Sequence, residues 1–167
     1  MKKWLLAAAF IAVCSPIFAQ NIYNASRRYQ GEISAGYALG LGDAPGRGVA
    51  QTVHGIRFSP YFFAGLGAGI IYQNFENPQY GDETILYMPA FVNSKAYYPI
   101  ADKLAVFVSL DLGASIDINY NQGDCNFYTT AGPGISYGED RAVEFSVRYL
   151  NQGSGSDAIL FNLGFRF

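Results

Sequence analysis

The side chains best suited to chemistry in this sequence are charged groups that recur at alternate positions of otherwise apolar segments. On the polar or small-residue side of these segments lie Glu32, Arg57, Lys95, Asp111, Glu144, Arg148 and Arg166. Alternate residues of a strand point to opposite faces, so one face of each strand collects charges of both signs. Charges that are removed from water must be paired. The spacing therefore predicts an internal network of ion pairs.

Two pairs within this network follow from simple hairpin counting. Pairing across residues 41–48 sets Glu32 opposite Arg57, and counting across residues 151–157 sets Glu144 diagonal to Arg166. Such a network could gate or plug a pore, or it could fill the interior as a structural element. We favour the structural role, because a small closed sheet leaves little continuous path for water.

His54 and Cys125 are the remaining candidates for chemistry. A catalytic His needs a nucleophile and an orienting group nearby, and the only His of the chain has no Ser two residues later. Strict alternation from Phe58 places His54 on the apolar face, unless a bulge near Gly55 turns it inward. Cys125 is the only Cys beyond residue 14, so it has no internal disulfide partner. We predict no catalytic residue, no metal site and no cofactor.

The elements that position these groups are eight alternating segments separated by turn residues. We expect strands at residues 29–40, 49–59, 61–73, 84–98, 103–118, 125–137, 142–150 and 158–167. No segment after the start has helical periodicity or 18 uninterrupted apolar residues. The connections alternate between long and short, which is typical of outer-membrane barrels with longer extracellular loops and short periplasmic turns.

The two faces of these segments differ in the way that a membrane barrel requires. Glycines concentrate on the polar face, where they would make room for long side chains inside a narrow lumen. Aromatic residues of the apolar face gather at the strand ends: Tyr29, Phe58, Phe62, Tyr98, Tyr137, Phe165 and Phe167 at one end, and Tyr72, Phe127, Tyr149 and Phe161 at the other. Two such girdles mark bilayer interfaces. We predict an all-β, eight-stranded antiparallel up-and-down transmembrane β-barrel; a soluble sandwich with an aromatic core is the alternative.

The start of the chain predicts export. Lys2 and Lys3 precede an apolar run over residues 4–18, and Ala19–Gln20 is a plausible cleavage point. We expect a signal peptide over 1–19, a polar periplasmic leader over 20–28 and the barrel over 29–167, located in the outer membrane. A membrane-anchoring helix and a lipoprotein site at Cys14 are the alternatives. The net charge of −2 gives no electrostatic reason to expect nucleic acid as a partner.

With these elements in order, the chain resembles the eight-stranded outer-membrane β-barrel family, the OmpA/OmpX-like membrane domain. The resemblance rests on the signal peptide, the eight segments, the stretch MPAFVNSKAYY over 88–98 and the terminal Phe167. It implies a monomer in contact with outer-membrane lipid, and a last strand that the barrel-insertion machinery reads. The peptidoglycan-binding domain of full-length OmpA proteins is not expected.

The family resemblance leaves several functions open. A structural or surface-interaction role without enzyme activity is the expected one, and a narrow pore for small solutes is the alternative. A barrel enzyme acting on lipid is less favoured, because the lipid A deacylases use a His with a nearby Ser and His54 has no Ser at that spacing.

Overall fold

The computed structural model describes residues 28–42, 44–77, 81–119, 125–153 and 157–167. The predicted signal peptide over 1–19 lies outside the described residues, as does the predicted leader over 20–28 except for Arg28. Among the described residues, no helix has the length and apolar character needed to cross a bilayer.

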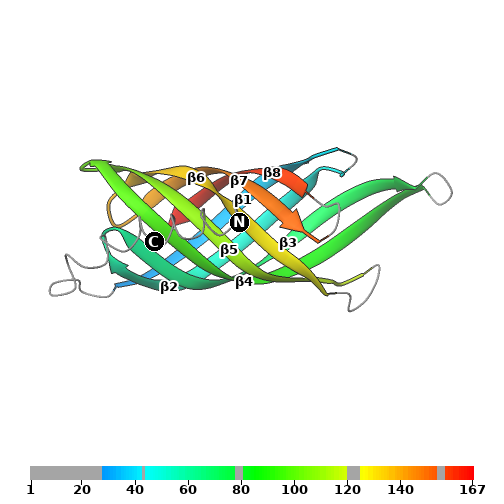
Figure 1. The fold of residues 1–167 in the computed structure, drawn as a ribbon, viewed down its shortest axis with the longest axis horizontal. Coiled ribbons are helices and arrows are strands. Elements are labelled where there is room, and N and C mark those ends of the chain that lie inside the picture. Colours follow the sequence, from blue (N-terminus) through cyan, green and yellow to red (C-terminus); the bar gives the residue numbers. More distant parts are fainter. Residues whose placement is uncertain (1–27, 43, 78–80, 120–124, 154–156) are drawn as a thin grey trace, which may run out of the picture.

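The chain forms a single sheet that closes on itself (Figure 1). Its strands are β1 (Arg28–Gly40), β2 (Arg47–Ser59), β3 (Phe62–Asn77), β4 (Gly81–Ala101), β5 (Leu104–Asp117), β6 (Cys125–Gly138), β7 (Ala142–Gln152) and β8 (Asp157–Arg166). Each strand pairs antiparallel with the next, and β8 pairs antiparallel with β1. The predicted all-β, eight-stranded antiparallel up-and-down barrel is confirmed.

Burial in this barrel is inverted relative to a water-soluble protein. Inside, Asp111 is 0% exposed and Lys95 is 3% exposed, whereas Leu66 and Tyr98 on the outer face are 69% and 70% exposed. The inversion follows from the alternating sequence, since the polar and small residues of each strand turn inward and the apolar ones turn outward. A soluble sandwich would bury the apolar face between two sheets, so that alternative is wrong.

The β3–β4 hairpin is longer than the sequence suggests. Residues 74–83 were expected to form a loop because they are polar, yet β3 and β4 remain paired out to Asn77 and Gly81. The neighbouring strands stop earlier: pairing with β2 ends at Gln73 of β3, and pairing with β5 ends at Tyr87 of β4. The hairpin therefore projects beyond the barrel as a two-stranded ribbon, on the right in Figure 1. Backbone pairing satisfies its N–H and C=O groups without help from side-chain pattern.

The register between β1 and β2 also differs from the simple hairpin. Glu32 lies opposite Val53, and Arg57 lies opposite Arg28, so the predicted Glu32–Arg57 pairing is wrong. Ala38 is the last β1 residue paired with β2, while Leu39 and Gly40 pair only with β8. This offset arises because strands of a closed barrel are staggered by its shear, which symmetric counting across a loop ignores.

Candidate functional site

The interior of the barrel holds a lysine clamped between two carboxylates. Lys95 on β4 donates from Nζ to Glu32 on β1 and to Oε2 of Glu144 on β7, the latter at 2.6 Å. All three side chains are buried. The three strands are not neighbours in the sheet, so the ion pairs cross the lumen and tie its opposite walls together.

Glu144 is the most heavily bonded of these carboxylates. Its Oε1 accepts hydrogen bonds from the Tyr97 hydroxyl at 3.0 Å and from Ser136 Oγ at 3.2 Å. Arg166 Nε forms an ion pair with the same oxygen at 3.4 Å. The structure thus brings together Glu144 and Arg166, which the hairpin count set on a diagonal. A buried carboxylate is tolerated only with partners of this kind.

Arg57 lies in the same end of the lumen but makes no ion pair with Glu32. Its Nε donates to the carbonyl of Ser59 at 3.3 Å and its Nη2 to the carbonyl of Pro60 at 2.7 Å. Its guanidinium lies 4.7 Å from the centroid of the Tyr97 ring. These carbonyls are within reach because the register between β2 and β3 is irregular between Arg57 and Ser59.

A second buried cluster lies around Asp111. Arg148 Nη1 donates to Asp111 Oδ2 at 2.9 Å, and the Thr130 hydroxyl donates to the same oxygen at 2.6 Å. Asn93 donates to the other carboxylate oxygen. The sequence placed Asp111 and Arg148 on the interior face without pairing them. Thr130 and Asn93 were not among the residues predicted for the network.

Towards the ribbon end of the barrel, the interior contains polar residues that the sequence analysis missed. Arg47 Nη1 donates to Gln152 at 3.1 Å, and Gln152 donates to Ser115 at 2.9 Å. Arg47 was assigned to a loop because Gly and Pro surround it, but β2 begins there. Arg47 and the inward-facing Gln51 are four residues apart on β2, so they point to the same face. This alternation is the sequence signal that could have identified Arg47 as an interior residue.

Aromatic rings fill the lumen between these polar clusters. Phe91 packs on Tyr128 and Phe107 packs on Tyr97, with ring centroids 5.4 Å apart in each pair. A Cβ added at Gly67 would lie 2.3 Å from the Phe91 ring. The lumen-face glycines were expected to make room for long side chains, and at Gly67 the space is taken by the Phe91 ring. Tight packing of this kind leaves the centre of the barrel occupied.

The predicted girdle residues lie on the outer face. Ten of them are between 41% and 70% exposed: Tyr29, Phe58, Tyr72, Tyr98, Phe127, Tyr137, Tyr149, Phe161, Phe165 and Phe167. Phe62 is partly buried and its ring centroid lies 6.1 Å from that of Phe58. Large apolar side chains between the two ends are exposed as well, among them Val108 at 46% and Leu112 at 45%. The outer face is therefore an apolar band bordered by aromatic rings.

His54 faces outward within this band. It lies opposite Gly31 in a regular stretch of the ladder, so no bulge at Gly55 turns it inward. The Tyr29 hydroxyl lies 2.5 Å from Nδ1, and Thr52 Oγ1 lies 2.9 Å from Nε2. Thr52 Oγ1 also lies 3.1 Å from the Glu32 carbonyl oxygen. Both ring nitrogens of His54 therefore have a hydrogen-bond partner on the outer face.

Cys125 is an exposed free thiol at the start of β6. The described residues contain no group of three His, Cys, Asp or Glu side chains that could hold a metal ion.

Neither the protein-family models nor the curated proteins match this sequence. Solved structures do match. Neisserial surface protein A superimposes with a TM-score of 0.56 at 12% identity, covering 86% of this chain and 97% of that chain. The outer membrane enzyme PagL superimposes with a TM-score of 0.55 at 11% identity, covering 81% and 98%. This chain has the fold of the eight-stranded outer-membrane barrels. At these identities the likeness concerns the fold alone. One neighbour is named as an enzyme and the other as a surface protein.

Proposed function

We propose that this protein is a monomeric integral barrel of the outer membrane with a closed lumen and a structural or surface-interaction role. The observation that carries the proposal is the exposed apolar band around a polar, ion-paired interior. Exposing such a surface to water is unfavourable, since it costs about 25 cal/mol per Å² of apolar area. Lipid tails are the solvent that suits it.

The ends of the barrel support one orientation in the membrane. The three connections β2–β3, β4–β5 and β6–β7 are short and lie at the end where β1 begins and β8 ends. Short turns of outer-membrane barrels face the periplasm. The β3–β4 ribbon then projects from the cell surface, where it is available for contacts with other molecules. The aromatic end of β8 is the segment that the insertion machinery would bind.

The packed lumen argues for a closed barrel over the narrow-pore alternative. Phe63, Phe91, Phe107, Tyr97 and Tyr128 are each no more than 5% exposed, and the ion pairs cross the remaining space. We expect the refolded protein to show no steady single-channel conductance in planar bilayers. Sustained conductance would favour the pore.

We also propose that the barrel is not an enzyme, although one structural neighbour is named as one. The position of His54 supports this view, since it lies on the outer face and its ring nitrogens are engaged by Tyr29 and Thr52. Purified protein should leave outer-membrane lipid unchanged, and any turnover that His54→Ala abolishes would contradict the proposal.

The membrane location is tested by cell fractionation and by mass spectrometry. We expect the protein in the outer-membrane fraction, with a mature chain that begins at Gln20. Purified protein should also fold on addition of lipid vesicles and then migrate differently on gels with and without heating. Recovery in the soluble periplasm would contradict the proposal.

A further inference from the structure

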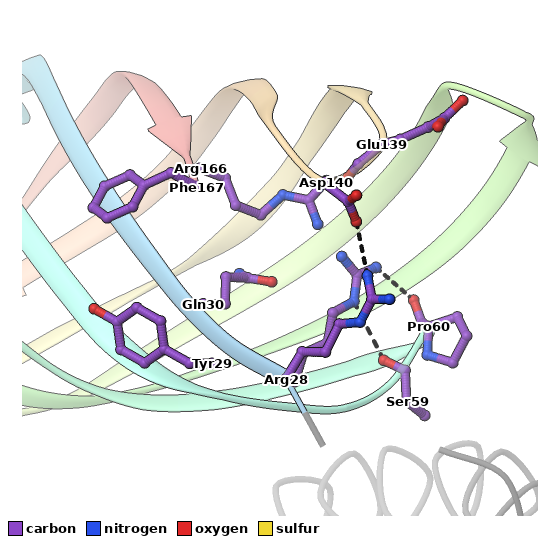
Figure 2. A pocket seen from close by; sticks show the side chains of 10 residues that line it. Arg28, Tyr29, Gln30, Ser59, Pro60, Glu139, Asp140, Arg166 and Phe167 are labelled. Atoms are coloured by element: carbon purple, nitrogen blue, oxygen red, sulfur yellow. Dashed lines mark hydrogen bonds and ion pairs between the residues drawn. The ribbon is translucent and has the colours of Figure 1, made fainter. Parts of the chain in front are cut away.

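A pocket of about 540 Å³ opens at the end of the barrel where β1 begins and β8 ends (Figure 2). Side chains from both faces of the sheet line it. Gln30 and Arg166 are buried interior residues, whereas Tyr29 and Phe167 belong to the outer aromatic girdle and are 64% and 43% exposed. The pocket therefore connects the bottom of the lumen with the outer surface at the aromatic border of the apolar band.

The inner wall of this pocket carries an excess of positive charge. Arg57 and Arg166 lie 4.7 Å and 5.7 Å from the centroid of the same Tyr97 ring. Together with Lys95 they are three cations, and the carboxylates among them are Glu32 and Glu144. One positive charge is left without a counter-charge in this cluster. Cations with little access to water favour a bound anion.

Two buried donors at the same wall are only weakly bonded. Gln30 is 4% exposed, and its side chain interacts with the Tyr97 hydroxyl, but its Nε2 makes no hydrogen bond of normal geometry. Arg166 Nε is buried and reaches Glu144 only as an ion pair at 3.4 Å. Figure 2 shows the Gln30 side chain among Arg166, Tyr29 and Arg28. Buried donors without acceptors are uncommon and call for a missing partner.

The acidic residues at the mouth do not supply that partner. Asp140 is engaged with Arg28 at 2.9 Å, in a pair whose side chains are 88% and 70% exposed. The Glu139 carboxylate points away from the arginines in Figure 2, and its backbone carbonyl accepts from Arg166 at 2.9 Å. These two acidic side chains therefore leave the positively charged wall open to an oxyanion from a ligand.

We propose that this pocket binds the phosphate of an anionic phospholipid from the inner leaflet. Guanidinium groups present paired donors that match phosphate oxygens. The two aromatic rings at the outer edge suit the glycerol and upper acyl chain, because aromatic side chains prefer the border between headgroup and tail. The inference rests on the proposed membrane location, which places this end of the barrel at the periplasmic interface.

The test is native mass spectrometry of the protein refolded in neutral detergent and titrated with phosphatidylglycerol. Diacylglycerol with the same chains is the control ligand, since it lacks the phosphate. We expect Arg57→Gln to weaken phosphatidylglycerol binding at least about tenfold, the loss of one charge-assisted hydrogen bond. Arg141→Gln is the matched control, because it makes the same charge change at the same end on an exposed residue outside the pocket. That variant should bind as the wild type does.

Gln30→Leu is the second variant, and it tests the site if Arg57→Gln does not fold. Removing its amide should weaken phosphatidylglycerol binding without altering diacylglycerol binding. Equal binding of the two lipids by the wild type, or equal loss in Arg57→Gln and Arg141→Gln, would overturn the proposal. Glycerol phosphate or inorganic phosphate binding as tightly as the lipid would overturn the lipid source. A protein that never forms a heat-modifiable barrel would instead refute the proposed membrane location.

Discussion

Lys95→Met is expected to lower the free energy of unfolding by about 3–5 kcal/mol, the usual cost of removing one partner of a buried ion pair. Lys95 is the ion-pair partner of Glu32 among the described residues, whereas Glu144 keeps Arg166, Tyr97 and Ser136. The substitution therefore strands Glu32, which is 4% exposed. Methionine retains most of the lysine stem, so little packing against Phe107 is lost.

The partner substitution and the double variant separate pairing from packing. Glu32→Gln should cost about 1–2 kcal/mol, because a neutral amide still accepts from Lys95 and the lysine keeps Glu144. The double variant leaves no stranded charge, so its loss should fall short of the sum of the two single losses by roughly 2 kcal/mol. That shortfall is the coupling between the two residues.

The assay is urea unfolding of each variant in lipid vesicles, followed by the gel mobility of unheated samples. Glu32→Gln combined with Arg57→Met is the control cycle, because Arg57 lies four residues beyond the residue opposite Glu32, about 13 Å along the strand. Those losses should add within about 0.5 kcal/mol. Additive losses in the Lys95 cycle, or coupling in the Arg57 cycle, would refute the assignment of partners.

Three further perturbations test other parts of the barrel. Val108→Arg places a charge on the exposed outer face and should lower the free energy of unfolding in vesicles by about 2–4 kcal/mol. Ser109→Ala, on the buried inner face, should lower it much less. Equal losses for the two variants would show that the faces are reversed. Gly67→Val should destabilise the barrel by about 1–3 kcal/mol through a clash with Phe91. Adding Phe91→Ala should recover part of this loss. A double variant that recovers none of it would show that the valine clashes with another residue. Cys125 should react with a membrane-impermeant maleimide in intact cells; protection until lysis would mean that the barrel is inserted the other way round.

The alternation of polar and apolar residues was enough to predict the strands and their faces. In β5 every inward and outward assignment from Ala105 to Asp117 follows from a period of two, because one face is apolar and the other lines a polar lumen. Strand ends were less predictable. The mostly polar residues 74–77 continue β3 as a ribbon, since a mostly polar sequence is compatible with a loop and with a hairpin that projects beyond the barrel.

The partners within the lumen could not be derived from the sequence. The alternation of polar and apolar residues predicts that Lys95 and Glu32 point inward. It does not predict that they meet, because their strands are three apart in the sheet. Which of them meet depends on the stagger of the strands and on the diameter of the barrel. Pairs on adjacent strands, such as Glu144 and Arg166, could be predicted by counting residues across the hairpin when its two strands pair symmetrically about the turn. Glu32 and Arg57 were not, because the β1–β2 hairpin is offset.

The pairing of β8 with β1 has a consequence for the timing of assembly. The Gly31 and Phe167 backbones exchange two hydrogen bonds, at 2.8 Å and 2.9 Å, across more than 130 residues of sequence. In the closed sheet this edge of β1 pairs with β8, so it has no native partner until β8 docks. Folding is slow when contacts span such separations, and an open edge invites pairing with other chains. Closure of β8 onto β1 therefore removes the last open edge of the sheet, and with it the opportunity for pairing with another chain.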